Sequence, residues 1–314
     1  MAVEFDKKCL EVIFSSDDAY ARHMGVAMYS LLDKNRTFER IRVYLIENGI
    51  QPDNKAKLEE TAARFPNAEV HWIDFSAWLD KLNLNQAWPL SFSSYARLFV
   101  ASMLPESVNR ILYLDSDMVV NDSLSALWQT DLQGNIVGAV QDFVNDTTKE
   151  AVGVERTSPY FNAGMLLIDL DAWRAEKVED SCLHCIEKHD GNVTHHDQGV
   201  LNEVLHGRCT FLPIRYNLMT IHYIFDRRKL TKYYQDHAPF YSEEEVAEAK
   251  AHPAILHYTP SFTTRPWIAH CKHPRKDLYW EALEKTPWRG CAVSPDRTKW
   301  YLRLINWRYR HLWY

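Results

Sequence analysis

Two aspartates one residue apart end an apolar segment of this chain. Asp115 and Asp117 lie in RILYLDSDMVV, residues 110–120. Neighbouring carboxylates repel each other, and one tends to keep its proton unless a cation lies between them. A divalent ion that prefers oxygen ligands would remove this conflict and leave coordination positions open for phosphate oxygens. The alternative is a solvated turn or helix cap, because Asp-Ser-Asp before a helix is a common arrangement.

The elements that must position these acids alternate between strands and helices. We predict strands at 10–18, 41–47, 68–75, 110–117, 135–142, 161–173 (running into a helix) and 254–258, and helices at 19–32, 52–65, 91–104 and 196–206. This alternation predicts an α/β fold with a parallel or mixed sheet covered on both faces, and ligands bind beyond the carboxyl ends of such strands. Four residues fall at or next to predicted strand ends, namely Asp17, Asp115, Asp142 and His257.

Composition narrows the class of protein. The chain has 314 residues, of which 46% are hydrophobic, and its net charge of −6 argues against nucleic-acid binding. Cys182 and Cys185 form a lone CxxC without a second pair at zinc-ligand spacing, so we expect reduced thiols. No secretion signal and no run of 18 apolar residues is seen, which predicts a cytoplasmic protein.

The last segment, residues 297–314, differs in composition from the rest of the chain. It is RTKWYLRLINWRYRHLWY, with five Arg or Lys, six Trp or Tyr and no acid. One interpretation is a packed helix pair with the Trp residues in its core. The other is an anchor at a membrane interface, where basic side chains meet anionic lipid and aromatic rings lie at the headgroup level.

The RILYLDSDMVV segment resembles the Asp-x-Asp segment of nucleotide-sugar glycosyltransferases with the GT-A fold. It most resembles glycosyltransferase family 8, the retaining group that includes glycogenin and bacterial lipooligosaccharide galactosyltransferases. Five further blocks resemble the family in the same order: VIFSSDDAYARHMGVAMYSLL (12–32), SSYARLF (93–99), FNAGMLLIDLDAW (161–173), HHDQGVLNEVL (195–205) and LHYTPSFTTRPW (256–267). The resemblance implies a Rossmann-like mixed sheet flanked by helices, with a catalytic domain at 1–267 holding nucleotide-sugar and acceptor halves. Residues 268–314 would form a helical extension.

The resemblance also implies a nucleotide site at the first strand. Asp17 would bond the uracil edge, Tyr20 would stack on the ring, and Ser15 would offer backbone contacts; Ser116 is assigned to the same site. Stacking on a base contributes about 1–3 kcal/mol. The alternative for Tyr20 is simple helix packing. Ala19 stands where the family has an asparagine, which places one ribose contact in question.

The same resemblance implies three metal ligands, Asp115, Asp117 and His257. An imidazole beside two carboxylates suits Mn²⁺ better than Mg²⁺, which is the alternative ion. Arg97 would lie beside the diphosphate and the donor sugar, or else form a structural ion pair with one of the acids. Arg265 stands where the family has a phosphate-binding lysine, after a longer spacing from the histidine.

Three catalytic residues are implied at the donor sugar: Asn162, Asp197 and Gln198. Asp197 would bond sugar hydroxyls, although an acid at the start of a helix is also typical of an N-cap. Gln198 would lie under the anomeric carbon. An amide is a poor nucleophile, so we favour a same-face displacement over a double displacement through Asp197. Asp142 is a candidate for the acceptor side.

These expectations describe a retaining, Mn²⁺-dependent hexosyltransferase. It would move glucose or galactose from a UDP-hexose to a glycan or lipid-linked glycan of a bacterial surface polysaccharide such as lipopolysaccharide, in the cytoplasm or peripherally on the inner membrane face. The alternative is a nucleotide-sugar-binding protein without transfer activity. A nucleotide-sugar pyrophosphorylase is a weaker alternative, because no Gly-rich basic loop follows the first strand.

Overall fold

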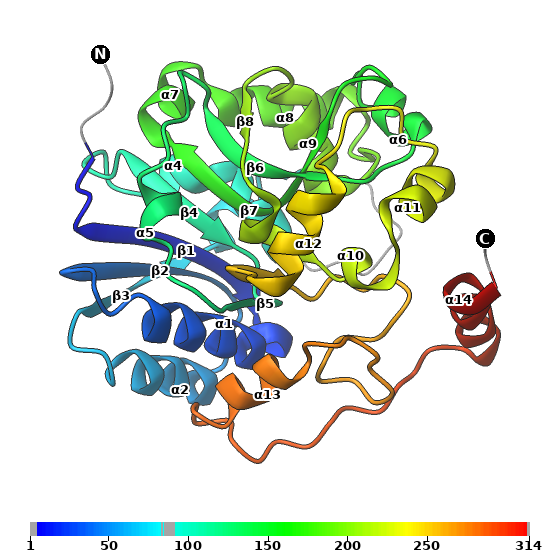
Figure 1. Ribbon diagram of the computed structural model, residues 1–314. Helices are drawn as coiled ribbons and strands as arrows, with labels where there is room; N and C mark the ends of the chain where they lie inside the picture. Colours follow the sequence, from blue (N-terminus) through cyan, green and yellow to red (C-terminus); the bar gives the residue numbers. More distant parts are fainter. Residues whose placement is uncertain (1–4, 83, 85–91, 313–314) are drawn as a thin grey trace.

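A seven-stranded mixed sheet forms the centre of the computed structural model, which describes residues 5–82, 84 and 92–312 (Figure 1). Its strand order is β3-β2-β1-β4-β7-β6-β8, with β7 antiparallel to both neighbours and the other pairs parallel. The strands are β1 (Cys9–Asp17), β2 (Arg40–Asn48), β3 (Ala68–Asp74), β4 (Arg110–Leu114), β6 (Val137–Asp142), β7 (Tyr160–Asp169) and β8 (Cys209–Phe211). The predicted mixed α/β sheet is confirmed.

Helices cover both faces of this sheet (Figure 1). Alternate residues of β4 show why: Leu112 and Leu114 pack into one buried cluster, Ile111 and Tyr113 into another. The α-helices are α1 (Ala21–Lys34), α2 (Pro52–Ala62), α3 (Ser76–Leu79), α4 (Val100–Met103), α5 (Ser125–Trp128), α6 (Asp146–Ala151), α7 (Leu170–Ala175), α8 (Val178–Lys188), α9 (His196–Val204), α10 (Ile221–Ile224), α11 (Arg227–Tyr234), α12 (Glu243–Ala251), α13 (Asp277–Leu283) and α14 (Trp300–Leu312). The 3₁₀ helices are η1 (Asp18–Tyr20), η2 (Phe92–Phe99) and η3 (Ile214–Asn217).

A second, three-stranded sheet explains why the strand predicted at 110–117 is shorter in the structure. Its order is β5-β10-β9, formed by β5 (Met118–Val120), β10 (Ile255–His257) and β9 (Leu218–Met219). The predicted strand at 110–117 ends at Leu114, and the chain crosses to β5 in the other sheet. Asp115 and Asp117 therefore lie in the connection between two sheets.

The helix predicted at 91–104 also differs from the structure. Most of it is the 3₁₀ helix η2, and residue 91 lies outside the described part.

Strand β7 carries an irregularity beside this crossing. Its pairing with β6 jumps between Ala139, opposite Leu166, and Val140, opposite Asn162. The residues in between turn toward β4, where the Gly164 carbonyl accepts a hydrogen bond from the Asp115 amide at 2.8 Å. Bulges of this kind re-aim side chains next to active sites.

The part of the predicted extension around α13 belongs to the main core. Tyr279 and Leu283 of α13 are buried together with residues of α1, and the Tyr279 hydroxyl lies 2.7 Å from His23 Nδ1. Trp288 packs so closely on α1 that a Cβ at Gly25 would come within 2.4 Å of its ring. The predicted domain boundary at residue 267 therefore does not separate two hydrophobic cores, because aromatic side chains C-terminal to it pack on helix α1.

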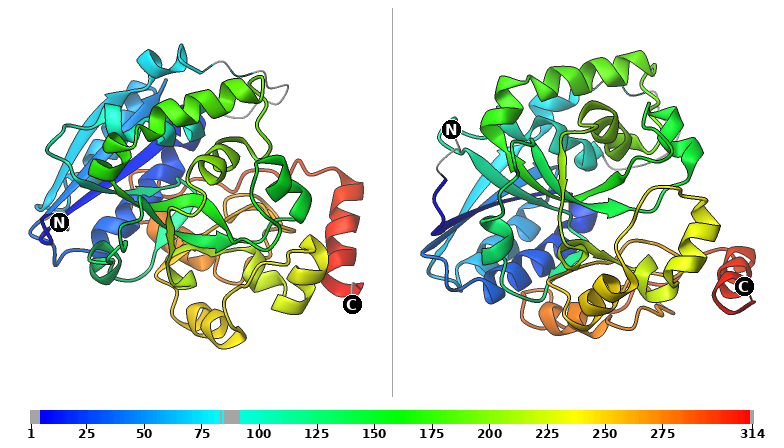
Figure 2. Two further views of the ribbon diagram at one scale, coloured as in Figure 1. Left: turned by 90° about the horizontal axis from the view of Figure 1, so that it is seen from above. Right: turned by 45° about the horizontal axis from the view of Figure 1, so that its top comes forward.

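Helix α14 lies at the rim of the molecule (Figure 2). Trp300 is 76% exposed, Leu304 57% and Trp307 47%, whereas Tyr309 contacts Tyr233 and Phe262. The described tryptophans of α14 are therefore exposed and do not form the core of a packed helix pair. Within the described residues, every helix is too short or too polar to cross a bilayer.

Candidate active site

The two aspartates and the distant histidine meet where the two sheets join. His257 Nε2 lies 3.1 Å from Asp117 Oδ1 and 3.8 Å from Asp115 Oδ2. One ligand atom from each residue lies within 4.8 Å of the other two, and Asp117 and His257 are buried. Two carboxylates and an imidazole form a donor set for Mn²⁺ or a related divalent ion.

Gly164 keeps the space between these ligands open. A Cβ on this residue would lie 2.5 Å from His257 Cε1 and 2.8 Å from Asp115 Oδ2. These separations are well below van der Waals contact, so a side chain at this position would fill the space in which an ion would sit. The residues present therefore fit a divalent metal by both donor chemistry and shape.

Asn217 orients the histidine and was missed by the sequence analysis. Its Oδ1 lies 2.9 Å from His257 Nδ1, while its Nδ2 donates to Asn162 Oδ1 at 2.8 Å. The second bond fixes which way the Asn217 amide points, so Nδ1 of the histidine carries the proton and Nε2 faces the acids. A buried asparagine in a 3₁₀ turn gives no sequence pattern that could have revealed this role.

The surroundings separate the pKa values of the two aspartates. Burial acts to raise the pKa of Asp117, but His257 and Arg265 outweigh burial and hold it well below its usual range. Burial raises the pKa of Asp115, an effect that Arg97 opposes and the Asp117 charge reinforces. Burial and the charge of Asp117 therefore both disfavour the ionised form of Asp115, and a bound cation would stabilise that form.

Arg97 links the predicted metal site to the predicted sugar site. It is 4% exposed; Nη2 donates to Asp115 Oδ1 at 2.8 Å, and Nε lies 2.9 Å from Asp197 Oδ2. Nη1 donates to the Ala163 carbonyl. Each nitrogen of the guanidinium already has a partner, so the geometry favours the structural ion pair over direct binding of the diphosphate. Asp197 is not the N-cap of α9 either, because that position is His195.

Arg265 contacts the carboxylate oxygen of Asp117 that His257 does not contact. Its Nε and Nη2 are 3.1 and 2.8 Å from Asp117 Oδ2, and its guanidinium is 5.8 Å from the ring centres of Tyr20 and Trp267. The side chain is 21% exposed, so one side of it faces solvent. Its place beside the acids suits a phosphate-binding cation.

The other residues predicted for the nucleotide site lie around the carboxyl end of β1. The Ser116 hydroxyl donates to the Ser15 carbonyl at 3.0 Å, and the Ser15 hydroxyl donates to the Ser93 carbonyl at 2.7 Å. Asp17 caps η1 by accepting from the Tyr20 amide at 3.1 Å. Tyr20 is half-buried, with its ring packed against those of His23 and Trp267.

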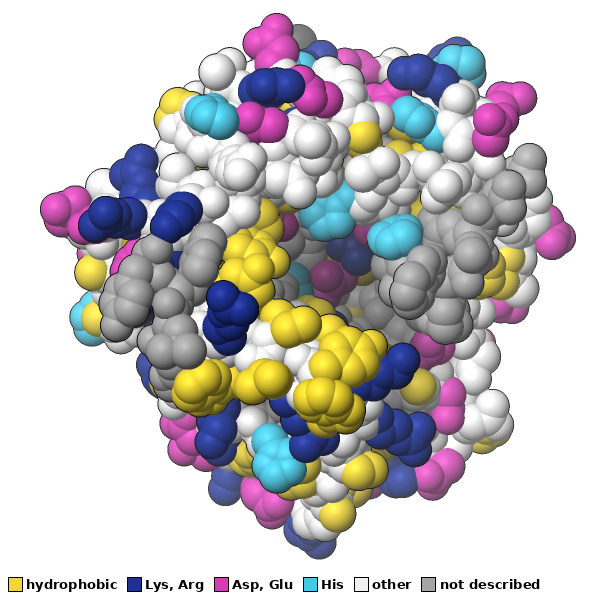
Figure 3. Space-filling view, turned by 90° about the vertical axis from the view of Figure 1, so that its right-hand side faces the viewer, with side chains coloured by type: hydrophobic (Ala, Val, Ile, Leu, Met, Phe, Trp, Pro, Cys, Tyr) yellow, Lys and Arg dark blue, Asp and Glu magenta, His cyan; other side chains and the backbone are white. Residues whose placement is uncertain are grey.

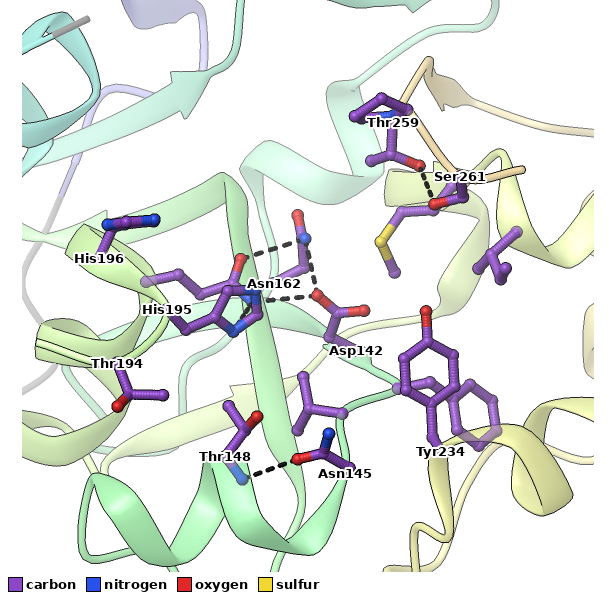
Figure 4. Close-up of a pocket in the computed structure, with 16 residues that line it drawn as sticks. Asp142, Asn145, Thr148, Asn162, Thr194, His195, His196, Tyr234, Thr259 and Ser261 are labelled. Atoms are coloured by element: carbon purple, nitrogen blue, oxygen red, sulfur yellow. Dashed lines mark hydrogen bonds between the residues drawn. The ribbon is translucent and has the colours of Figure 1, made fainter. Parts of the chain in front are cut away.

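Gln198 lies in a hydrogen-bonded group that lines a cavity of about 520 Å³. Asp142, Asn162 and His195 of this group are labelled in Figure 4. Gln198 Oε1 accepts from the Ala163 amide at 3.0 Å and from Asn162 Nδ2 at 3.2 Å, and its Nε2 donates to Asp142 Oδ2 at 3.0 Å. Asn162 Nδ2 also donates to Asp142, at 3.0 Å. The candidate acceptor-side acid and two candidate sugar-site residues therefore share one network.

His195 and Tyr234 also line this cavity, and the sequence analysis did not assign either of them a role. His195 has φ +65°, a left-handed conformation that costs a non-glycine residue energy and is concentrated at functional sites. Its Nδ1 lies 3.1 Å from the Tyr160 hydroxyl, and burial lowers its pKa. Backbone strain of this kind has no signature in the amino-acid types.

Comparison with known proteins gives these residues a context. The model of Glycosyl transferase family 8 matches residues 11–271. General stress protein A of Bacillus subtilis is 28% identical, over 89% of this chain and 94% of its own length. The lipopolysaccharide 1,2-glucosyltransferase of Escherichia coli is 29% identical, over 97% of this chain and 86% of its own.

A solved structure shows the same fold. The galactosyltransferase LgtC, crystallised with donor and acceptor sugar analogs, superposes with a TM-score of 0.69 at 27% identity, covering 88% of this chain and 96% of its own. The matched residues 11–271 contain the Asp115–Asp117–His257 cluster and the network around Gln198. The chain therefore belongs to glycosyl transferase family 8, a family of enzymes that transfer sugars.

Proposed function

We propose that this protein is a retaining hexosyltransferase that uses a UDP-hexose and Mn²⁺, with Mg²⁺ as the alternative ion. The observation that carries this proposal is the open cradle of Asp115, Asp117 and His257, joined to the Gln198 network. Asn162 makes the connection, since its Oδ1 accepts from the Gly164 amide at 3.0 Å and its Nδ2 donates to Gln198. A diphosphate at the cradle would place its sugar toward Gln198.

The chain's own charges suit departure of a diphosphate. A divalent ion bound at the cradle would neutralise negative charge that develops on the leaving group. Arg265 lies beside Asp117 and is exposed on one side, so it is placed to hold a phosphate oxygen. Arg97 holds Asp115 and Asp197 in position through one ion pair with each.

The same contacts favour a same-face displacement. Asp197 is held in an ion pair by buried Arg97, which occupies one of its carboxylate oxygens and makes it a weaker nucleophile. Gln198 is an amide held by four partners, namely Asn162, Ala163, Asp142 and His195. The acceptor hydroxyl would therefore attack the anomeric carbon on the face that the diphosphate leaves, and its proton would pass to the departing phosphate oxygen. The new glycosidic bond replaces the bond to UDP, and the configuration is retained.

The relatives support a hexose donor and a surface glycan acceptor. One is named a lipopolysaccharide 1,2-glucosyltransferase and another a lipopolysaccharide 1,3-galactosyltransferase, the latter from Salmonella typhimurium. We therefore propose glucose or galactose as the sugar and a lipopolysaccharide-type, lipid-linked glycan as the acceptor. The site of action would be the cytoplasm, peripherally on the inner membrane face.

The proposal predicts that Asp117→Asn stops release of UDP. Purified protein with Mn²⁺ and UDP-glucose or UDP-galactose should liberate UDP slowly by hydrolysis and faster with rough lipopolysaccharide. Loss of one buried ligand charge should lower this rate on the order of a thousandfold. The measurement is a coupled assay of free UDP.

Asp122→Asn is the matched control, because Asp122 follows Asp117 by five residues and is an exposed acid that pairs with Arg215. It should release UDP at the wild-type rate. Tight binding of UDP-hexose with no release of UDP by the wild type, whichever acceptor is added, would instead identify the nucleotide-sugar-binding protein.

The exposed face of α14 supports peripheral contact with anionic membranes. Trp300, Leu304 and Trp307 are exposed beside Lys299 and Arg308. Wild-type protein should sediment with phosphatidylglycerol vesicles and less with phosphatidylcholine vesicles. A variant with all three apolar residues changed to serine should lose most of this binding. Equal sedimentation of the variant and the wild type would refute the contact.

A further inference from the structure

A second cavity lies next to the one at Gln198. It measures about 640 Å³ and shares three lining residues with the first, namely Tyr234, Pro260 and Ser261. One of its walls is the loop from Pro260 to Lys272, and another is α14, which contributes Leu302, Arg303 and Asn306. The face in Figure 3 is hollowed, with hydrophobic and basic side chains gathered at the rim of the hollow. The two cavities are therefore neighbours; the second is lined by Arg265 on one side and extends to Lys272 and α14 on the other.

Aromatic rings line the junction of the two cavities. Tyr233 lies 4.9 Å from Tyr234 and 5.2 Å from Phe262, centre to centre, and Phe143 stacks 6.2 Å from Tyr234 in the first cavity. Tyr309 of α14 belongs to the same aromatic group, with its ring centre 5.4 Å from that of Tyr233. Rings that present an apolar face and a polar tip suit the faces and hydroxyls of sugar rings.

The second cavity has more cationic than anionic lining. Its charged or titratable residues are Arg265, His270, Lys272, Asp296 and Arg303. Asp296 balances Arg303 at 3.2 Å, and Asp117 balances Arg265 at 2.8 Å. Lys272 is exposed, and no carboxylate among the described residues lies within ion-pair distance of it. Its amide donates to Thr263 Oγ1 at 2.8 Å, which fixes its backbone in the wall.

We propose that the second cavity is a remote acceptor subsite, and that Lys272 binds a negatively charged substituent, a phosphate or carboxylate, on an acceptor glycan longer than one sugar. This rests on the proposed function, since it needs the reacting end of the acceptor to lie in the first cavity. The glycan runs over Tyr234 and Ser261, its rings lie against the aromatic group, and its charged part reaches Lys272. Helix α14 thus forms one wall of the acceptor site.

The test is calorimetric titration of protein saturated with UDP and Mg²⁺, so that the donor site is filled. The probe is the phosphorylated core oligosaccharide released from rough lipopolysaccharide, used before and after chemical removal of its phosphates. We expect wild type to bind the phosphorylated form about tenfold more tightly. Lys272→Glu should reduce this preference to below about twofold, and Lys272→Gln should give an intermediate value.

Arg308→Glu is the matched control: a charge reversal on α14 at a residue that does not line the cavity. It should keep the wild-type preference, and thermal unfolding should show that all three variants are folded. Equal binding of both probes by wild type, or an unchanged preference in Lys272→Glu, overturns the subsite. Failure of UDP to bind in the first step counts against the proposed function instead.

Discussion

Gly164→Ala is expected to lower affinity for Mn²⁺ by on the order of a hundredfold and to stop UDP release with it. The added methyl group would lie within 2.5 Å of His257 and 2.8 Å of Asp115. Neither neighbour can move away cheaply. His257 is held by Asn217, and Asp115 Oδ1 accepts from the Tyr113 hydroxyl at 3.0 Å as well as from Arg97.

Mn²⁺ affinity should be measured by electron paramagnetic resonance of the free ion, alongside the UDP assay. Gly138→Ala on β6 is the matched control, because the nearest neighbours of its added methyl group would be the Leu132 and Leu212 side chains. That variant should lose some stability and keep its affinity for Mn²⁺. Wild-type affinity in Gly164→Ala would show that the ion, if one binds, does not occupy the cradle.

Arg97→Leu is expected to be the most destabilising single change in the site. It would leave Asp115 and Asp197 as unpaired carboxylates beside a buried apolar side chain, and breaking a buried ion pair in this way costs about 3–5 kcal/mol. Urea unfolding of the metal-free protein measures the loss. Arg36→Leu is the control, because its pair with Asp33 is exposed and should contribute less than about 1 kcal/mol.

The deficit of Arg97→Leu should depend on pH. Burial already raises the pKa of Asp115, and removing Arg97 raises it further above the unfolded value of about 3.9. The folded variant then holds a proton that the unfolded chain has released, so its stability falls as pH rises through this interval. The deficit relative to wild type should be larger at pH 8 than at pH 5. A deficit that is the same at both pH values would show that Asp115 stays ionised without Arg97.

The strand and helix alternation was predictable because its signals are local and long. β1 and β2 are nine-residue strands, and α1 follows a clear apolar periodicity. The Asp-x-Asp pair was recognisable as a possible cation site from its two neighbouring carboxylates, and His257 was recognisable through the resemblance to family 8. The ends of elements were less predictable: the strand expected at 110–117 ends at Leu114, because residues 115–117 form the connection to β5 in the other sheet.

Other features depend on contacts between residues far apart in sequence. Arg97 was assigned to the diphosphate, and its two carboxylate partners are 18 and 100 residues away. Asn217 orients His257 from 40 residues away. The boundary at 267 was drawn where family resemblance ended, but Trp288 completes the cover of α1. The local sequence around Trp288 does not indicate that its side chain packs on a helix more than 250 residues earlier in the chain.

The position of the acids between two sheets has a consequence for evolution of the enzyme. Asp115 and Asp117 leave the large sheet at β4, whereas His257 ends β10 in the small one, paired with Met118 across the ladder. Any repacking that slides one sheet against the other alters the gap among these three side chains. We therefore expect evolution to constrain substitutions at the seam, including apolar ones remote from any sugar, because they would alter this gap.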